Sequence, residues 1–289
     1  MSKPSRILYP VPAPTTAAPE AGPTALPAGQ SGGRNAPAQG GNALYLDHFK
    51  LREAPFRMAS HTGFFFTGAS RRATLEALAY AVVNDDGIVK VSGEVGSGKS
   101  MLCRMLLGRL PAHAHPVYLP NPALSREEIL LAVAGELGLT LQQSHIHQSL
   151  RLLEEHLARL HAAGRQVVVL IDEAHMMPGE ALGEICRLSN LETHAGTLLQ
   201  IVLFGQPELD KRLLNPDMRQ LRERITHNFA LSPLSRSETA DYLAFRLRAA
   251  GYQGPELFSA GAVRLIAEAS EGLARRVNVL ADKALLAAF

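Results

Sequence analysis

The apolar residues of this chain follow two patterns, short runs and helical spacing. Residues 166–171 form a nearly continuous apolar run, typical of a strand buried on both faces of a parallel sheet. From Ile146 onward, apolar side chains recur every three or four residues up to Leu160, which places them on one helix face. Apolar runs at residues 88–92 and 198–204 predict two further strands, and the shorter segments at residues 115–119 and 225–229 also have the pattern of strands. The pattern predicts an α/β domain with a central parallel five-stranded sheet.

Helical patterns occupy the intervals between these runs. One covers residues 69–83 and another follows the first strand directly. Ser125 opens a further helix, with Glu128 completing a capping box. Asn215 begins a short arginine-containing helix before the last strand.

Beyond residue 232 the strand patterns stop. Three helical patterns follow, over residues 235–250, 259–270 and 273–289. The sequence therefore predicts an α/β domain over residues 43–232 and a small all-helical lid domain over residues 233–289. Residues 1–42 are rich in Pro, Ala and Gly, have little to bury, and are predicted to be a disordered arm, either a tether, a partner-binding peptide or a solvated tail.

Charge is nearly balanced along the chain. Its 289 residues include 29 Lys and Arg and 27 Asp and Glu, so the net charge is +2. That excess comes from residues 1–42, which contain three basic residues (Lys3, Arg6 and Arg34) and one acidic residue (Glu20). Residues 43–289 therefore carry no net charge. This balance argues against a strong nucleic-acid or anionic-membrane surface.

The two cysteines and the first residues of the chain indicate the cellular compartment. Cys103 and Cys186 lie inside helical patterns, so we interpret them as small buried side chains and not as a disulfide, metal or redox pair. No apolar run is long enough to span a bilayer, and the basic start is followed by prolines where a signal peptide would be apolar. We expect a cytoplasmic protein.

A glycine-rich loop follows the first predicted strand. Gly93, Gly98, Lys99 and Ser100 fit G-x-x-x-x-G-K-S, and a helical pattern begins at once, the context that a phosphate-binding P-loop requires. Its backbone N–H groups would face a polyphosphate, with Lys99 as a cation and Ser100 as a Mg²⁺ ligand. A chance glycine-rich turn is the alternative. The residues predicted to bind the nucleotide here are Gly93, Glu94, Val95, Gly96, Ser97, Gly98, Lys99, Ser100 and Met101.

Two acids end the buried strand at residues 166–171. Asp172 would hold Mg²⁺, directly or through water, and Glu173 would polarise the water that attacks the γ-phosphate. A solvated acidic turn is the alternative, and the P-loop upstream argues against it.

Three further features are candidates for nucleotide contacts. Gln206 follows the strand at residues 198–204, which we expect between the acidic strand and the P-loop strand, and it is placed there to sense the γ-phosphate. The alternative is a helix-starting turn. Arg275 begins the last helix and is placed to reach the nucleotide, or is surface charge. Aromatic residues between Tyr45 and Phe66, with Pro55 and Phe56 among the candidates, form either a wall for the adenine or a strap over a sheet edge.

With these pieces assembled, the chain resembles the AAA+ ATPases of the general secretion pathway protein A and MSHA pilus biogenesis group. The resemblance rests on residues 45–56, 93–100, 171–175, 188–193, 199–209 and 220–225. Leu-Ser-Asn-Leu-Glu-Thr and Gly-Gln-Pro-Glu-Leu are narrower signals than the P-loop. Family members often have Pro where this chain has Ala274, and the longer relatives carry a membrane span and a peptidoglycan-binding domain after the ATPase.

This resemblance implies an AAA+ fold with ATP and Mg²⁺ bound between subunits of a homo-oligomeric ring. It implies that Arg224 is an arginine finger, with Arg222 as the fallback, that Arg275 is sensor 2, that Gln206 lies in the sensor 1 region and that Glu173 is the catalytic base. The implied function is ATP hydrolysis that drives assembly of a secretion or type IV pilus machine. The implied partners are inner-membrane proteins, which would hold this protein at the membrane surface. An ATP-dependent DNA-binding transposition regulator and a nucleotide-gated scaffold are the alternatives, and the neutral charge makes DNA the less favoured partner.

Overall fold

The structure is a computed structural model that describes residues 45–58, 62–68, 70–120, 123–141, 146–194 and 196–289. The arm predicted for residues 1–42 lies outside the described residues.

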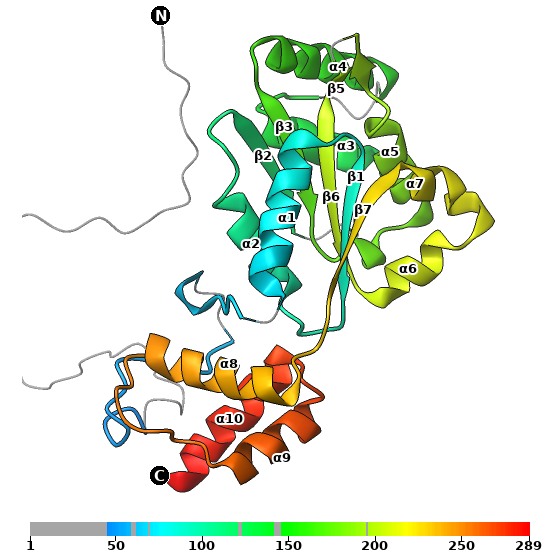
Figure 1. The fold of residues 1–289 in the computed structure, drawn as a ribbon. Coiled ribbons are helices and arrows are strands. Elements are labelled where there is room, and N and C mark those ends of the chain that lie inside the picture. The colour runs from blue at the N-terminus through cyan, green and yellow to red at the C-terminus, as the bar shows by residue number, and fades with distance from the viewer. Residues whose placement is uncertain (1–44, 59–61, 69, 121–122, 142–145, 195) are drawn as a thin grey trace, which may run out of the picture. The chain divides into compact units, whose positions relative to one another are not determined.

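The predicted five-stranded sheet is present, and its strands are all parallel. Its order is β2-β3-β6-β1-β7 (Figure 1). The strands are β1 (Ile88–Gly93), β2 (Ala114–Leu119), β3 (Gln166–Ile171), β6 (Leu199–Gly205) and β7 (Ile225–Leu231). Because all five run the same way, the carboxyl ends of β1, β3 and β6 meet at one edge. β6 lies between β3 and β1, which brings the residue after β6 between the acidic strand and the P-loop strand.

Helices cover both faces of this sheet, which explains why its central strands are almost fully buried and largely apolar. On one face lie α1 (Arg71–Asn84) and α2 (Lys99–Leu107) (Figure 1). Both share a core with β3 side chains such as Leu170. On the other, α3 (Arg126–Glu136), α4 (Ile146–Ala162) and α5 (Gly179–Leu188) pack on the alternate β3 side chains, such as Val169. The shorter helices α6 (Pro207–Leu213) and α7 (Arg219–Arg224) lie between β6 and β7 in sequence.

Three helices follow β7, namely α8 (Arg236–Ala249), α9 (Ala260–Ser270) and α10 (Ala274–Ala288). Their core includes aromatic residues of the segment before α1, among them Tyr45, Phe56 and Phe66. These aromatic side chains therefore complete the helical core and do not form a strap over a sheet edge. None of the helices in the described part of the chain has the length and apolarity needed to cross a membrane.

Sequence signals for helix capping are present in the structure at two helix starts. Ser125 with Glu128 and Ser235 with Glu238 both form complete capping boxes. A hairpin of β4 (Glu192–Thr193) and β5 (Gly196–Thr197) was not predicted, because each strand has only two residues. Three short 3-10 turns, η2 (Thr62–Phe64), η4 (Ala174–Met176) and η5 (Pro216–Met218), complete the described elements used below.

Candidate functional site

A pocket of about 260 Å³ lies where the P-loop meets the helices that follow β7. Four parts of the sequence contribute to it, namely residues 57–71, residues 95–101, Glu173 and residues 242–278. Its lining residues are Arg57, Met58, Phe64, Phe65, Phe66, Arg71, Val95, Gly96, Ser97, Gly98, Lys99, Ser100, Met101, Glu173, Tyr242, Arg246, Ala274, Arg275 and Asn278. The predicted residues 95–101 are thus all at this pocket.

The P-loop backbone has the shape that its glycines permit. Gly98 has a φ of +105°, and a Cβ added there would meet no described atom within 4 Å, so the pocket side of this residue is open. Gly96 has a φ of +81° and lies under α10. Ser97 is only 1% exposed, and its Oγ has no hydrogen-bond partner among the described residues. The loop therefore holds an unsatisfied buried hydroxyl beside an open backbone cradle.

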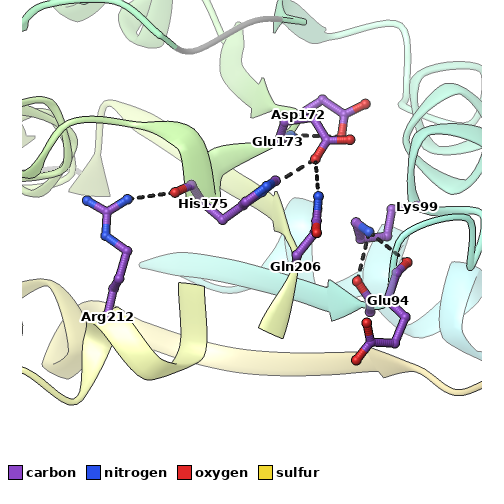
Figure 2. Close-up of polar contacts among 8 residues, drawn as sticks. Glu94, Lys99, Asp172, Glu173, His175, Gln206 and Arg212 are labelled. Atoms are coloured by element: carbon purple, nitrogen blue, oxygen red, sulfur yellow. Dashed lines mark hydrogen bonds and ion pairs between the residues drawn. The ribbon is translucent and has the colours of Figure 1, made fainter. Parts of the chain in front are cut away.

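Lys99 is buried against the carbonyl groups of its own loop. Its Nζ donates to the carbonyl of Gly93 at 2.8 Å and to that of Glu94 at 3.1 Å (Figure 2). Burial lowers the pKa of the Lys99 ammonium, an effect that the charges of Glu173 and Asp172 oppose. A desolvated ammonium held only by carbonyl oxygens is suited to pairing with a phosphate.

The two predicted acids follow β3 and differ in environment. Asp172 is 4% exposed, and its Oδ1 accepts from the backbone N–H of Glu173 at 2.9 Å. Burial, and then the charge of Asp172, raises the pKa of Tyr118 to about 12. Glu173 has a φ of +52°, in the left-handed region, and its side chain is 38% exposed. Glu173 lines the pocket, whereas Asp172 is not among the described residues that line it.

Gln206 connects the β6 strand end to Glu173. Its Nε2 donates to Oε2 of Glu173 at 3.3 Å, and Figure 2 shows the two side chains pointing toward each other. This contact follows from the strand order, because β6 lies beside β3. The structure thus brings together Lys99, Glu173 and Gln206, which are distant in sequence.

Arg275 joins the helical part of the chain to the P-loop. Its backbone N–H donates to the carbonyl of Gly96 at 3.1 Å, and its side chain lines the pocket. Asn278, one turn further along α10, is 6% exposed and accepts a hydrogen bond from the Tyr242 hydroxyl at 2.9 Å. Ala274 begins α10.

Two buried arginines at the pocket were not predicted. Arg71, at the start of α1, donates from Nη2 to the Ser97 carbonyl at 3.1 Å. Arg246 of α8 donates from Nε to the Pro55 carbonyl at 2.6 Å and from Nη2 to the Arg57 carbonyl at 3.0 Å. Burial lowers the pKa of both guanidinium groups. A lone arginine in a helical pattern gives no sequence signal for such a position.

The predicted aromatic contact falls on different residues. Phe56 is 2% exposed and packs among the helices, and the lining of the pocket, within the described residues, does not include Pro55 or Phe56. Phe64, Phe65 and Phe66 line it, so the apolar wall of this pocket comes from the Phe-Phe-Phe run.

Arg224 lies away from this pocket. It ends α7, at the amino end of β7, whereas Leu231 at the carboxyl end of β7 pairs with Gly93. The seven residues of β7 span about 20 Å at the usual rise of a strand. Arg224 donates from Nη1 to Oε1 of Glu192 at 3.1 Å, and Arg222 donates from Nη1 to the Leu213 carbonyl at 3.3 Å. The structure therefore does not bring either predicted finger to the pocket of its own chain.

The residues at the pocket fit the ligands that the sequence implies. Several cationic side chains, the open P-loop and the orphaned Ser97 hydroxyl suit a polyphosphate. The Ser100 hydroxyl and the Asp172 carboxylate are the hard oxygen donors that Mg²⁺ prefers.

Comparisons with known proteins show the family to which the chain is similar. A family model described as an AAA domain matches residues 83–213. General secretion pathway protein A of Aeromonas hydrophila is 37% identical over 248 residues, covering 85% of this chain and 45% of the relative, so the chain spans about half that protein's length.

Solved structures with a similar fold include two archaeal proteins. The ADP form of Aeropyrum pernix ORC2 protein matches with a TM-score of 0.57 and 17% identity, over 78% of this chain and 64% of that one. Cdc6p from Pyrobaculum aerophilum matches with a TM-score of 0.57 and 15% identity, over 78% and 62%. At these identities the likeness shows the α/β P-loop fold.

Proposed function

Because the chain belongs to the AAA+ ATPases related to general secretion pathway protein A, we propose that it binds ATP with Mg²⁺ at the pocket beside the P-loop and hydrolyses it. The observation that carries this proposal is the Glu173 carboxylate at a pocket lined by the P-loop, with Gln206 hydrogen-bonded to it. This is a base and a polar side chain beside a phosphate-binding loop.

Each residue of the site then has a defined task. Lys99 exchanges its carbonyl partners for phosphate oxygens, and the P-loop N–H groups bind the remaining phosphate charge. Glu173 orients a water molecule and takes its proton while the water oxygen bonds to the γ-phosphorus and the bond to the ADP oxygen breaks. Gln206 and Arg275 contact the γ-phosphate. Ser100 and Asp172 would hold Mg²⁺, which neutralises phosphate charge when bound.

We propose further that the active unit is a homo-oligomer, a ring in which Arg224 of one copy completes the site of the next. The distance of Arg224 from the pocket of its own chain supports this proposal. An arginine finger stabilises charge on the transferred phosphoryl group and is worth about 10³-fold or more in rate. Arg222 is the alternative finger.

The machine that this turnover would drive is proposed from the relative. General secretion pathway protein A is named after a secretion pathway. We propose that residues 43–232 and 233–289 act as the ATPase and lid domains of a protein that powers assembly of a secretion or type IV pilus machine. The proposed partners are inner-membrane assembly proteins, and the proposed place is the cytoplasmic side of that membrane.

The test is ATP hydrolysis measured against protein concentration, with and without plain duplex DNA. A rate per subunit that rises cooperatively without DNA is the expected result, because a shared site forms only on assembly. Activity that stays low until DNA is added, with a steep loss at higher salt, would replace the secretion or pilus role by the transposition-regulator role. Tight ATP binding without hydrolysis under every condition would favour a nucleotide-gated scaffold.

A further inference from the structure

The turn that carries Glu173 is strained and held by several contacts. A φ of +52° is unusual for a residue with a side chain and costs roughly 1–2 kcal/mol. Such a conformation persists only where the surrounding structure fixes it, and it is concentrated at functional sites. The contacts that fix the turn are therefore part of the site.

His175 is one of these contacts. It lies in η4, two residues after Glu173, and its side chain is 13% exposed. Its Nδ1 is buried without a hydrogen-bond partner among the described residues, and Oε2 of Glu173 is 3.4 Å away. A small movement of either side chain lets an Nδ1–H donate to that oxygen, because the separation exceeds an ordinary hydrogen bond only slightly. Figure 2 shows His175 and Gln206 both directed at the Glu173 carboxylate.

The position of His175 is itself set by α6. Arg212, near the end of this helix, donates from Nη1 to the His175 carbonyl at 2.7 Å (Figure 2). Gln206 immediately precedes the same helix and donates to Glu173. The two ends of α6 thus hold the Glu173 turn, one through a side chain and the other through the backbone of η4.

From this geometry we propose that His175 and Arg212 are positioning residues for the catalytic base. Gln206 and the Nδ1–H tautomer of His175 both bind Oε2, and this leaves Oε1 of Glu173 to orient water and accept its proton. Arg212 keeps the imidazole within reach of Oε2. The proposal rests on the proposed ATPase function, since it assigns both residues a role through Glu173 and none in binding the nucleotide.

The first experiment compares His175→Leu and His175→Asn with the wild type in steady-state hydrolysis. A loosened base loses rate because misplacement by about 1 Å can cost up to 10²-fold. We expect His175→Leu to lower kcat by about 10- to 100-fold while KM and the ATP dissociation constant stay within about 2-fold. His175→Asn retains a donor near the place of Nδ1 and should recover most of kcat. Arg212→Gln should lower kcat in the same way, because it releases the His175 carbonyl.

The second experiment repeats His175→Leu in a Glu173→Gln background. If His175 acts through the base, the double variant should have the residual rate of Glu173→Gln alone, within about 2-fold. Met176→Gln is the matched control, because Met176 belongs to the same turn and is 58% exposed. Thermal unfolding midpoints of all variants separate loss of positioning from loss of fold.

The outcomes are distinct. Three results would overturn the positioning role while the ATPase function stands. His175→Leu could keep full kcat, or it could change only the affinity for ATP. It could also lower the rate as much in the Glu173→Gln background as in the wild type. A His175→Leu protein that loses its fold leaves His175→Asn and Arg212→Gln to decide the question. A wild type without hydrolysis at any concentration would overturn the proposed function and this role together.

Discussion

Arg275 rests on Gly96 through direct backbone contact, with its N–H 3.1 Å from the Gly96 carbonyl oxygen. A Cβ added to Gly96 would lie 2.6 Å from the Cβ of Arg275, so no side chain fits between the P-loop and the first turn of α10. A shift of the P-loop backbone on nucleotide binding therefore reaches α10 directly. This contact joins the phosphate-binding loop to the helices that follow β7.

The first prediction concerns this contact. Gly96→Ala should weaken ATP binding at least 10-fold and lower the thermal unfolding midpoint, because it adds a close contact to left-handed backbone strain of roughly 1–2 kcal/mol. Gly138→Ala is the control, since Gly138 has a similar φ of +77° but no described atom within 4 Å of an added Cβ. It should lose stability and keep ATP affinity. Equal ATP affinities in the two variants would contradict a role for the contact.

The sequence was sufficient to predict the elements that hold most of the site. Largely apolar runs located the central strands β1, β3 and β6, because these strands are covered on both faces. The edge strands β2 and β7 are only partly buried and contain polar residues, and they were predicted from shorter patterns. The placement of Gln206 beside Glu173 followed from expecting its strand between the acidic strand and the P-loop strand. The P-loop and the acidic pair are recognised from local spacing in the sequence. A parallel sheet then brings the carboxyl ends of their strands together.

The parts that could not be predicted depend on contacts between distant segments. Arg71 and Arg246 read as ordinary helix residues, and only the packing of α8 against residues 55–57 gives Arg246 its buried partners. Phe56 and Phe64 both belong to the helical core, but of these two described residues only Phe64 lines the pocket. Sequence pattern identifies aromatic segments but not which ring of a segment turns toward a ligand.

The second prediction separates binding from hydrolysis. Lys99→Ala should abolish ATP binding, because the ammonium is the buried cation of the P-loop. Glu173→Gln should bind ATP with near-normal affinity and hydrolyse it only at a small residual rate, because an amide cannot take the proton from water. Equilibrium binding of a fluorescent ATP analogue and phosphate release measure the two properties. Lys283→Ala, an exposed lysine of α10, is the control for loss of a positive charge. Normal turnover by Glu173→Gln would remove it as the base.

The third prediction concerns the buried guanidinium of Arg246. Its partners include the carbonyl oxygens of Pro55 and Arg57, and Arg246→Met would leave both without this donor. An unsatisfied buried polar group costs about 1–3 kcal/mol, so we expect a loss of about 3 kcal/mol in the free energy of unfolding. Arg248→Met, exposed on the same helix, should change it by less than about 0.5 kcal/mol. Urea denaturation measures both. Equal stability of the two variants would show that residues 55–57 do not need Arg246.

The fourth prediction identifies the arginine finger. Arg224→Ala should bind ATP normally and lose about 10³-fold in turnover, because the guanidinium would act on the phosphate of a neighbouring copy. Its present partner is Glu192, and the side chains are 40% and 50% exposed, so the pair is easily exchanged for a phosphate. Arg222→Ala, which removes a bond to the Leu213 carbonyl, is the matched comparison. Full turnover by Arg224→Ala at assembled concentrations would transfer the role to Arg222.

Mixing two inactive variants tests whether this site is shared between copies. Lys99→Ala subunits cannot bind ATP but retain Arg224, whereas Arg224→Ala subunits retain an intact P-loop. Where the two meet in the right order, Arg224 of the first faces the nucleotide of the second, and that interface is complete. Neither variant should hydrolyse ATP alone, and their mixture should recover activity with a maximum near equal proportions. A mixture that stays inactive at every ratio, although co-purification shows mixed oligomers, would mean that Arg224 does not act across the interface.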